Sequence, residues 1–375
     1  MPRWEQRGTN FPGNPEQKED EMRRLLAATA ILFTPVMSAG AQGVPPNFHQ
    51  TYDSHQLASQ TIDGGGGADS SDLAALTEQS GLLAPDISQR GDNLVNLVFT
   101  TTHLDTVTQR FNGRQEVENS IVSGALGALG AIEQTGNNIA GLITGNTIDL
   151  ADQLMGRDAL QHVRNTATLS TSFSSLSQFG SNTANLAVAD YAIGTATQDI
   201  EAGAQQIVDN TLYLTADAVV GEFISQSGAN YGNLMIADRI DSVSRVFAGD
   251  QIVNNTVYVS DTDNVPSITQ SGTNVANMIM ADYIGAIHQV SVGRQVVNNR
   301  VIGPDGEILT GPSIDQNEDN FMGPTTDVVN LAVIGTGTAD GSNGGEMSIS
   351  QEADYEQSSN GSNSSQAGNV VSITR

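Results

Sequence analysis

The chain has 375 residues, no cysteine and a formal net charge of −27 at pH 7. It can therefore form no disulfide bond, and nucleic acid is excluded as a partner because phosphate binding needs clustered lysine and arginine. So large a negative charge favours a basic partner or an atmosphere of cations, and it keeps copies of the chain apart until conditions favour association.

A secretory signal peptide is predicted over residues 22–41. The short basic start Met22-Arg23-Arg24 precedes an apolar run from Leu25 to Met37, and Ala39-Gly40-Ala41 is a small-x-small cleavage motif. The apolar run is too short to span a membrane. We therefore expect a secreted protein whose mature chain begins at Gln42. Residues 1–21 are then an over-called start or an unusual leader.

Residues 42–86 have the composition of a disordered polar lead-in. They contain Pro45-Pro46, four consecutive glycines at 64–67 and the polar run Asp69-Ser70-Ser71-Asp72. Such segments are typical of linkers. We expect no regular structure before residue 87.

Five copies of one unit occupy residues 87–302 and recur about every 45 residues, which is the signature of a solenoid. Each copy contains an alternating run such as Gln295-x-Val297-x-Asn299-x-Val301, preceded by a run such as Gln270-x-Gly272-x-Asn274. A period of two predicts strands with one constant face. The predicted fold is all-β: a β-solenoid of about ten short coils, two in each 45-residue unit, with flexible flanks.

Four short strands are predicted in each unit. In the last unit they cover about 267–270, 275–281, 286–291 and 295–301. Turns are expected at Ser271–Asn274 and at Gly293-Arg294, because Gly and Asn accept positive φ at low cost. The run 123–130 has three glycines and predicts an irregular connection between the first two units.

The repeated amides are the candidate functional residues. Equivalent residues of successive coils stack about 4.8 Å apart, so Gln and Asn side chains can hydrogen-bond along the stack. We predict that they point inward, while Val296 and Asn298 face outward. The predicted ladder residues are Gln89, Gln134, Gln178, Gln226, Gln270, Asn93, Asn138, Asn182, Asn230, Asn274, Gln115, Gln161, Gln206, Gln251, Gln295, Asn119, Asn165, Asn210, Asn255 and Asn299.

Degenerate repeats and a polar tail are predicted over residues 303–375. Pro304-Asp305-Gly306 predicts a loop, and 327–333 predicts one strand. The repeat pattern returns at Ile349-Ser350-Gln351 and at Gln366-Ala367-Gly368-Asn369-Val370, which indicates one more worn coil.

These units resemble the curlin repeats of curli-type bacterial fibres. The resemblance lies in Gln270-x-Gly272-x-Asn274-x-Ala276, in its counterpart that starts at Gln178, and in the spacings Gln289-x5-Gln295 and Gln109-x5-Gln115. It implies a secreted structural subunit that self-assembles into amyloid-like fibres on the bacterial surface, for biofilm matrix or adhesion. It also implies a surface nucleator and an outer-membrane secretion pore as partners.

Two alternatives stay open beside the fibre subunit. One is a monomeric β-solenoid adhesin that binds an extracellular polysaccharide or another surface. The other concerns Asp190, Asp238 and Asp282, which recur at matching positions and are either turn-forming residues or a place for Ca²⁺ to bridge.

Catalysis is not expected. The five histidines share no column, and no paired His, Ser-His-Asp order or phosphate-binding loop is present. We therefore predict no catalytic residue, metal ligand or cofactor.

Overall fold

The structure is a computed structural model. It describes residues 47–63, 86–124, 128–261, 266–310, 314–315, 326–334, 348–353, 356–359 and 365–373, all within one unit, Pro45–Arg375. The predicted leader, the signal peptide and the glycine and Asp-Ser runs of the lead-in lie outside the described residues.

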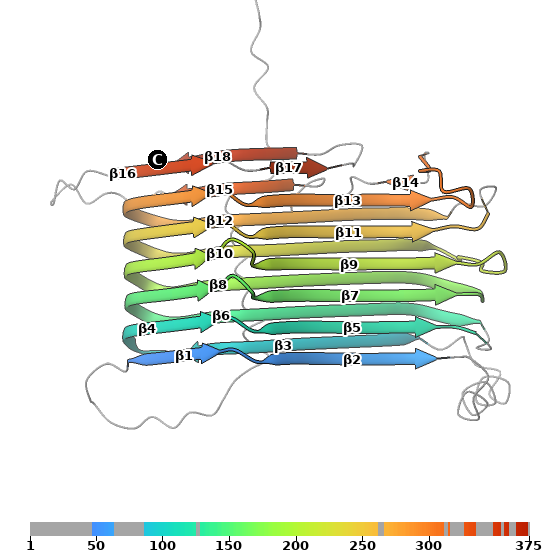
Figure 1. Cartoon of the computed structure of the whole chain (residues 1–375), viewed down its shortest axis with the longest axis horizontal. Helices are drawn as coiled ribbons and strands as arrows, with labels where there is room; N and C mark the ends of the chain where they lie inside the picture. The colour runs from blue at the N-terminus through green and yellow to red at the C-terminus, as the bar shows by residue number, and fades with distance from the viewer. Residues whose placement is uncertain are drawn as a thin grey trace, which may run out of the picture. The chain divides into compact units, whose positions relative to one another are not determined.

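The predicted all-β fold is confirmed, because the described residues form strands and no helix (Figure 1). Every named strand pair is parallel. The strands are β1 (Phe48–Tyr52), β2 (His55–Asp63), β3 (Ile87–Phe99), β4 (His103–Phe111), β5 (Arg114–Val122), β6 (Leu129–Met155), β7 (Leu160–Leu169), β8 (Phe173–Ile200), β9 (Gln205–Leu214), β10 (Phe223–Phe247), β11 (Asp250–Tyr258), β12 (Ser267–Ser291), β13 (Arg294–Ile302), β14 (Ile314–Asp315), β15 (Thr326–Ile334), β16 (Ser348–Ala353), β17 (Glu356–Ser359) and β18 (Ser365–Ile373).

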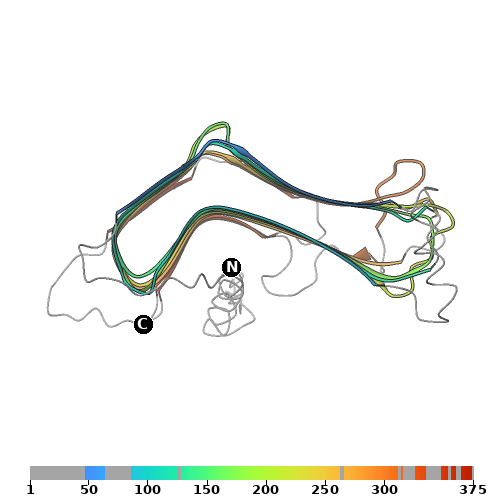
Figure 2. The same cartoon turned by 90° about the horizontal axis from the view of Figure 1, so that it is seen from below.

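Each 45-residue unit makes one coil of a parallel β-solenoid. Gln226 of β10 pairs with Gln178 of β8 and with Gln270 of β12, so one full unit separates strand neighbours. Figure 2 shows that the coil has two facing layers joined by a bend at one end. The long strands β6, β8, β10 and β12 run along layer 1, pass through the bend and begin layer 2; the shorter β7, β9, β11 and β13 complete layer 2.

The sequence predicted two coils per unit and hence about ten coils in all, whereas the strand register gives one coil per unit. Three of the four short strands expected in the last unit are successive parts of β12, and the fourth is β13. A curved strand carries the chain round the bend without a break in its pairing, so periodicity alone could not separate one long coil from two short ones. The second expected turn is present in part, because Gly293 lies between β12 and β13.

The turn expected at Ser271–Asn274 is also wrong. These residues lie inside β12 in register with Ser227–Asn230. A Cβ added to Gly272 would collide with Val297 Cγ1 of the facing layer, and each equivalent glycine meets a valine in the same way. These glycines therefore allow close approach of the layers. The valines form one buried column: Val117, Val163, Val208, Val253 and Val297.

The solenoid extends beyond the five predicted units at both ends. The lead-in predicted to be disordered contains β1 and β2, and Gln56 of β2 pairs in register with Gln115. Its alternation Gln56-x-Ala58-x-Gln60-x-Ile62 is a weak copy of the repeat, which the sequence interpretation missed. In the tail, β15 pairs with β12, β16 continues the same sheet, β17 pairs with β13, and β18 pairs with β15.

Candidate functional site

The buried amides form continuous ladders through the solenoid. All twenty predicted ladder side chains are at most 4% exposed. In sheet B (β2, β5, β7, β9, β11, β13 and β17), Gln206 Nε2 donates to Gln161 Oε1 at 2.9 Å, and Gln251 Nε2 donates to Gln206 Oε1 at 2.8 Å. The Asn ladder beside it joins Asn210 to Asn255 at 2.8 Å. Layer 1 carries a matching pair of ladders through Gln178 and Gln226 and through Asn182 and Asn230.

The Gln and Asn ladders run in opposite directions. Each Gln Nε2 donates to the Gln of the preceding coil, as Gln226 does to Gln178 at 2.7 Å. Each Asn Nδ2 donates to the Asn of the following coil, as Asn182 does to Asn230 at 2.9 Å. Because all named strand pairs are parallel and the repeat places the same amides in each coil, the direction is the same at each of the following steps. The Gln steps are 134→89, 178→134, 270→226, 161→115, 206→161, 251→206 and 295→251; the Asn steps are 93→138, 138→182, 230→274, 119→165, 165→210, 210→255 and 255→299.

The amide nitrogens also make hydrogen bonds that join the two layers. Gln206 Nε2 also donates to the main-chain carbonyl of Tyr231, 2.9 Å away in layer 1. Asn182 Nδ2 donates in the other sense, to the carbonyl of Ile207 in layer 2 at 2.8 Å. An amide that satisfies its donors in this way meets the requirement that buried polar groups be paired. The ladders therefore hold successive coils in register and the two layers together.

Two further ladders were missed by sequence reasoning. One contains Gln109, Gln153 and Gln198, and the other contains Asn185, Asn233 and Asn277. Asn185 has a positive φ of 32°, and its counterparts Asn96 and Gly141 have φ of 52° and 79°. A residue in this left-handed conformation changes which side chains point inward, so the strict alternation of two fails after it. The spacing Gln109-x5-Gln115 was the available signal.

Arg245 interrupts the column of Gln109, Gln153 and Gln198. It is fully buried and pairs in register with Gln198. Its Nη1 donates to the carbonyls of Asn233 at 2.9 Å and Met278 at 2.6 Å. Among the described residues its Nε and Nη2 have no partner, and neither does Gln198 Oε1. Burial lowers the pKa of Arg245 well below its ordinary value.

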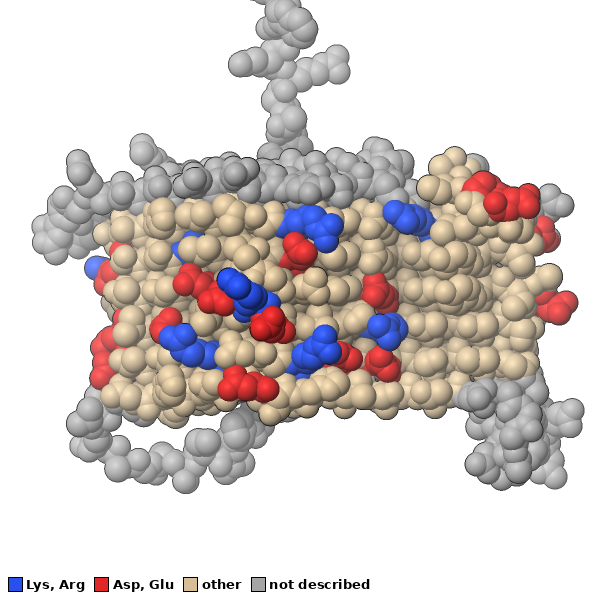
Figure 3. Space-filling model, viewed as in Figure 1, with Lys and Arg blue, Asp and Glu red and all other residues tan. Residues whose placement is uncertain are grey.

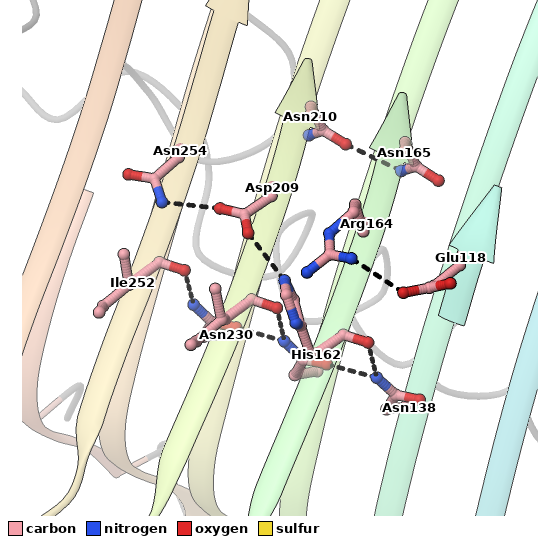
Figure 4. A network of polar contacts seen from close by, with 12 residues as sticks. Glu118, Asn138, His162, Arg164, Asn165, Asp209, Asn210, Asn230, Ile252 and Asn254 are labelled. Atoms are coloured by element: carbon pink, nitrogen blue, oxygen red, sulfur yellow. Dashed lines mark hydrogen bonds and ion pairs between the residues drawn. The ribbon is translucent and has the colours of Figure 1, made fainter. Parts of the chain in front are cut away.

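The outward face of sheet B carries charges of both signs (Figure 3). Figure 4 shows how they pair between coils: His162 Nε2 lies 2.7 Å from Asp209 Oδ2, and Arg164 Nη1 lies 2.9 Å from Glu118 Oε1. Asn254 Nδ2 donates to the other Asp209 oxygen at 2.7 Å. Burial raises the pKa of Asp209, but the hydrogen bonds from His162 and Asn254 and the charges of His162 and Arg164 outweigh it, so the pKa is lowered overall.

The acidic and histidine side chains of the described residues are scattered over the surface of the solenoid. No three His, Cys, Asp or Glu side chains there are grouped closely enough to hold a metal ion. Asp190 and Asp282 are exposed and Asp238 is half-buried, and each lies between the two inward-facing runs of its long strand. His55 and His103 make single surface pairs with Glu116 and Asp149, respectively. No helix among the described residues has the length and apolar character to cross a membrane.

Comparisons with family models, with curated proteins and with solved structures found no match to this chain.

Proposed function

We propose that the protein is a secreted structural subunit that assembles into amyloid-like fibres at the bacterial surface, in the manner that the curlin resemblance implies. One observation carries the proposal: a fully parallel stack of strands whose terminal strands have unpaired edges. In the described part of the chain β1, β2 and β3 are each paired along one edge only, and so are β16, β17 and β18 at the other end. An unpaired edge is a template for another strand.

The interior supports the same proposal. Among the side chains that the structure describes, the buried amide ladders repeat from coil to coil, with Arg245 as one interruption. Stacked amides gain from each further layer, because every added coil supplies a partner for the amide before it. A subunit of this kind contributes to a biofilm matrix or to adhesion through its length and its outer surface. A surface nucleator and a secretion pore remain part of the proposal on the resemblance alone.

A monomeric adhesin is the second candidate function. The rings of Tyr213 and Tyr258 stack on the outer face with centroids 4.7 Å apart, and Tyr213 is 42% exposed. Exposed aromatic residues on a flat sheet are suited to a polysaccharide. This function requires no contact between copies.

Electron microscopy of the purified mature chain after incubation at neutral pH tests the proposal. Fibres with a spacing of about 4.8 Å along their axis would support it, whereas dispersed particles would support the adhesin. Ala58 and Leu57 of β2 offer a matched pair of variants. Ala58 packs against the buried valine column and Leu57 is 52% exposed. Ala58→Arg should prevent β2 from closing on layer 1 and suppress fibres, while Leu57→Arg makes the same charge change and should leave fibres intact.

A further inference from the structure

The described strands, apart from the two-residue β14, form three columns of seven strands each. Column 1, in layer 1, is β3-β6-β8-β10-β12-β15-β18. Column 2, which starts layer 2, is β1-β4-β6-β8-β10-β12-β16. Column 3 is β2-β5-β7-β9-β11-β13-β17. A shift by seven strand spacings along the axis therefore continues all three columns at once.

The two ends of the solenoid are stepped. At the amino-terminal end β1 and β2 supply layer 2 of a coil, and the described residues contain no layer 1 strand at that level, because β3 belongs to the next coil with β4 and β5. At the carboxy-terminal end β18 continues layer 1 one strand beyond β15, while β16 and β17 end layer 2 one level earlier. Each end thus carries half a coil, and the halves come from opposite layers.

We infer that copies of this chain join head to tail by a lap joint, in which β1 and β2 of one copy and β18 of the preceding copy form a single shared coil. This inference deepens the proposed fibre function and rests on it. In the joint β3 of the new copy pairs with β18, β1 pairs with β16, and β2 pairs with β17. The terminal strands β1, β2, β3, β16, β17 and β18 then each have a neighbour on both sides.

The ladder directions permit only this orientation. The Gln donors point toward the amino-terminal end and the Asn donors point toward the carboxy-terminal end in each coil. Head-to-tail stacking continues both senses across the joint. Head-to-head stacking would reverse the sense of every ladder at the joint, and it would set like groups against one another, which leaves buried polar groups unpaired. At the amino-terminal end two Gln ladders already extend into the half coil, where Gln109 Nε2 donates to Gln50 Oε1 at 2.9 Å and Gln115 Nε2 donates to Gln56 Oε1 at 3.5 Å.

The strand register specifies which residues meet. Gln56 stands in the column of Gln115 and Gln295, and Gln357 of β17 pairs with Gln295. A second copy seated on β17 therefore brings its Gln56 beside Gln357 and its Leu57 beside Ser358. Within one chain Leu57 and Ser358 are six strand spacings apart in column 3, which is about 29 Å, so no disulfide could join them.

Cysteine cross-linking tests the joint, and the chain has no cysteine of its own. The variant carrying both Leu57→Cys and Ser358→Cys, assembled and then oxidised, should give a series of covalent multimers on a non-reducing denaturing gel. The control variant carries Leu57→Cys and Glu356→Cys, which places the second thiol two residues along β17, about 7 Å away. It should give few multimers. Leu57→Cys alone should give no covalent dimer. Dimers from that single variant, without multimers from the double variant, would show head-to-head contact and overturn the inference.

The axial repeat of unmodified fibres is a second test that needs no variant. Shared coils predict one subunit per seven strand spacings, about 34 Å along the axis. End-to-end contact without a shared coil needs eight levels per subunit, about 38 Å. A repeat near 38 Å would overturn the lap joint and leave the fibre function standing. A wild-type chain that forms no fibres would refute the fibre function and the joint with it.

Discussion

Replacing Arg245 with glutamine should stabilise the protein. Arg245 occupies a glutamine column, and its Nη1 donates to the carbonyls of Asn233 and Met278. Gln198 makes the equivalent contacts one coil earlier, with the carbonyls of Asn185 at 2.6 Å and Leu234 at 3.0 Å. A glutamine at 245 can therefore make these bonds with one amide nitrogen and donate to Gln198 Oε1 as well.

The size of the gain follows from the groups that the change removes or pairs. Arg245 Nε, Arg245 Nη2 and Gln198 Oε1 have no partner among the described residues. A buried unsatisfied group costs about 1–3 kcal/mol. The shorter side chain leaves some space unfilled, which offsets part of the gain. We expect a net increase of about 2–4 kcal/mol in the free energy of unfolding.

Denaturant unfolding followed by circular dichroism, with hydrogen exchange in β10 as a local measure, would test this expectation. Arg245→Met separates the two causes, because it removes the buried charge but leaves Gln198 Oε1 unpaired and removes the side-chain bonds to both carbonyls. It should gain less than Arg245→Gln. The reciprocal change Gln153→Arg should destabilise the neighbouring coil, since it adds a second interruption. A lower unfolding midpoint for Arg245→Gln than for the wild type would refute the reasoning.

Four further outcomes are expected. In urea unfolding, Asn299→Ala should lower the free energy of unfolding by about 1–3 kcal/mol. Asn298→Ala should lower it much less, because only Asn299 lies in a buried ladder. Equal losses would mean that the assigned faces are wrong. Gly228→Ala should destabilise by about 1–3 kcal/mol through collision with Val253, and thermal melts should show partial rescue by Val253→Ala. Asp199→Asn should stabilise the protein at pH 7, and this gain should vanish below about pH 4. The reason is that burial, together with the charges of Asp152 and Glu201, raises the pKa of Asp199, although a backbone hydrogen bond from Val246 opposes the shift. Asp209→Asn should destabilise the protein at pH 7, because the lowered pKa of Asp209 gives stability that is present above about pH 4 and lost as pH falls further. Unfolding midpoints of the two variants, measured across pH, would contradict both predictions if they shifted in the same direction relative to the wild type.

The period-two pattern was enough to predict strands, the all-β class and the inward face. Asn299 is 1% exposed and Asn298 is partly exposed, as alternation requires. The length of the coil could not be predicted in the same way, because β12 passes round the bend as one paired strand. Ser271–Asn274 has turn composition, yet Gly272 is needed for a close contact between the layers, which local preference cannot reveal.

The sequence interpretation missed the strands at the two ends of the solenoid for a related reason. In β2 the valine and asparagine of the repeat are replaced by Ala58 and Gln60, which keep the strand register; Ala58 packs against the valine column, while the Gln60 amide bonds to the main chain of Arg90. Pairing with a neighbouring strand tolerates such changes, whereas the composition of the surrounding glycine and proline runs favours disorder. Arg245 was missed for a different reason: in three coils of its column a left-handed residue, Asn96, Gly141 or Asn185, comes before the column position, so the inward side could not be counted from the Gln-x-Gly-x-Asn run.

The opposed ladders have an electrical consequence for a long fibre. An amide group has a dipole of about 3.5 D, and a column of amides that all point one way would accumulate charge of opposite sign at its two ends. Here three Gln columns point toward the amino-terminal end and three Asn columns point toward the carboxy-terminal end. The axial components oppose one another within each coil, so the side-chain field does not grow with the number of coils. A stack of this design can lengthen without an electrostatic penalty from its own interior.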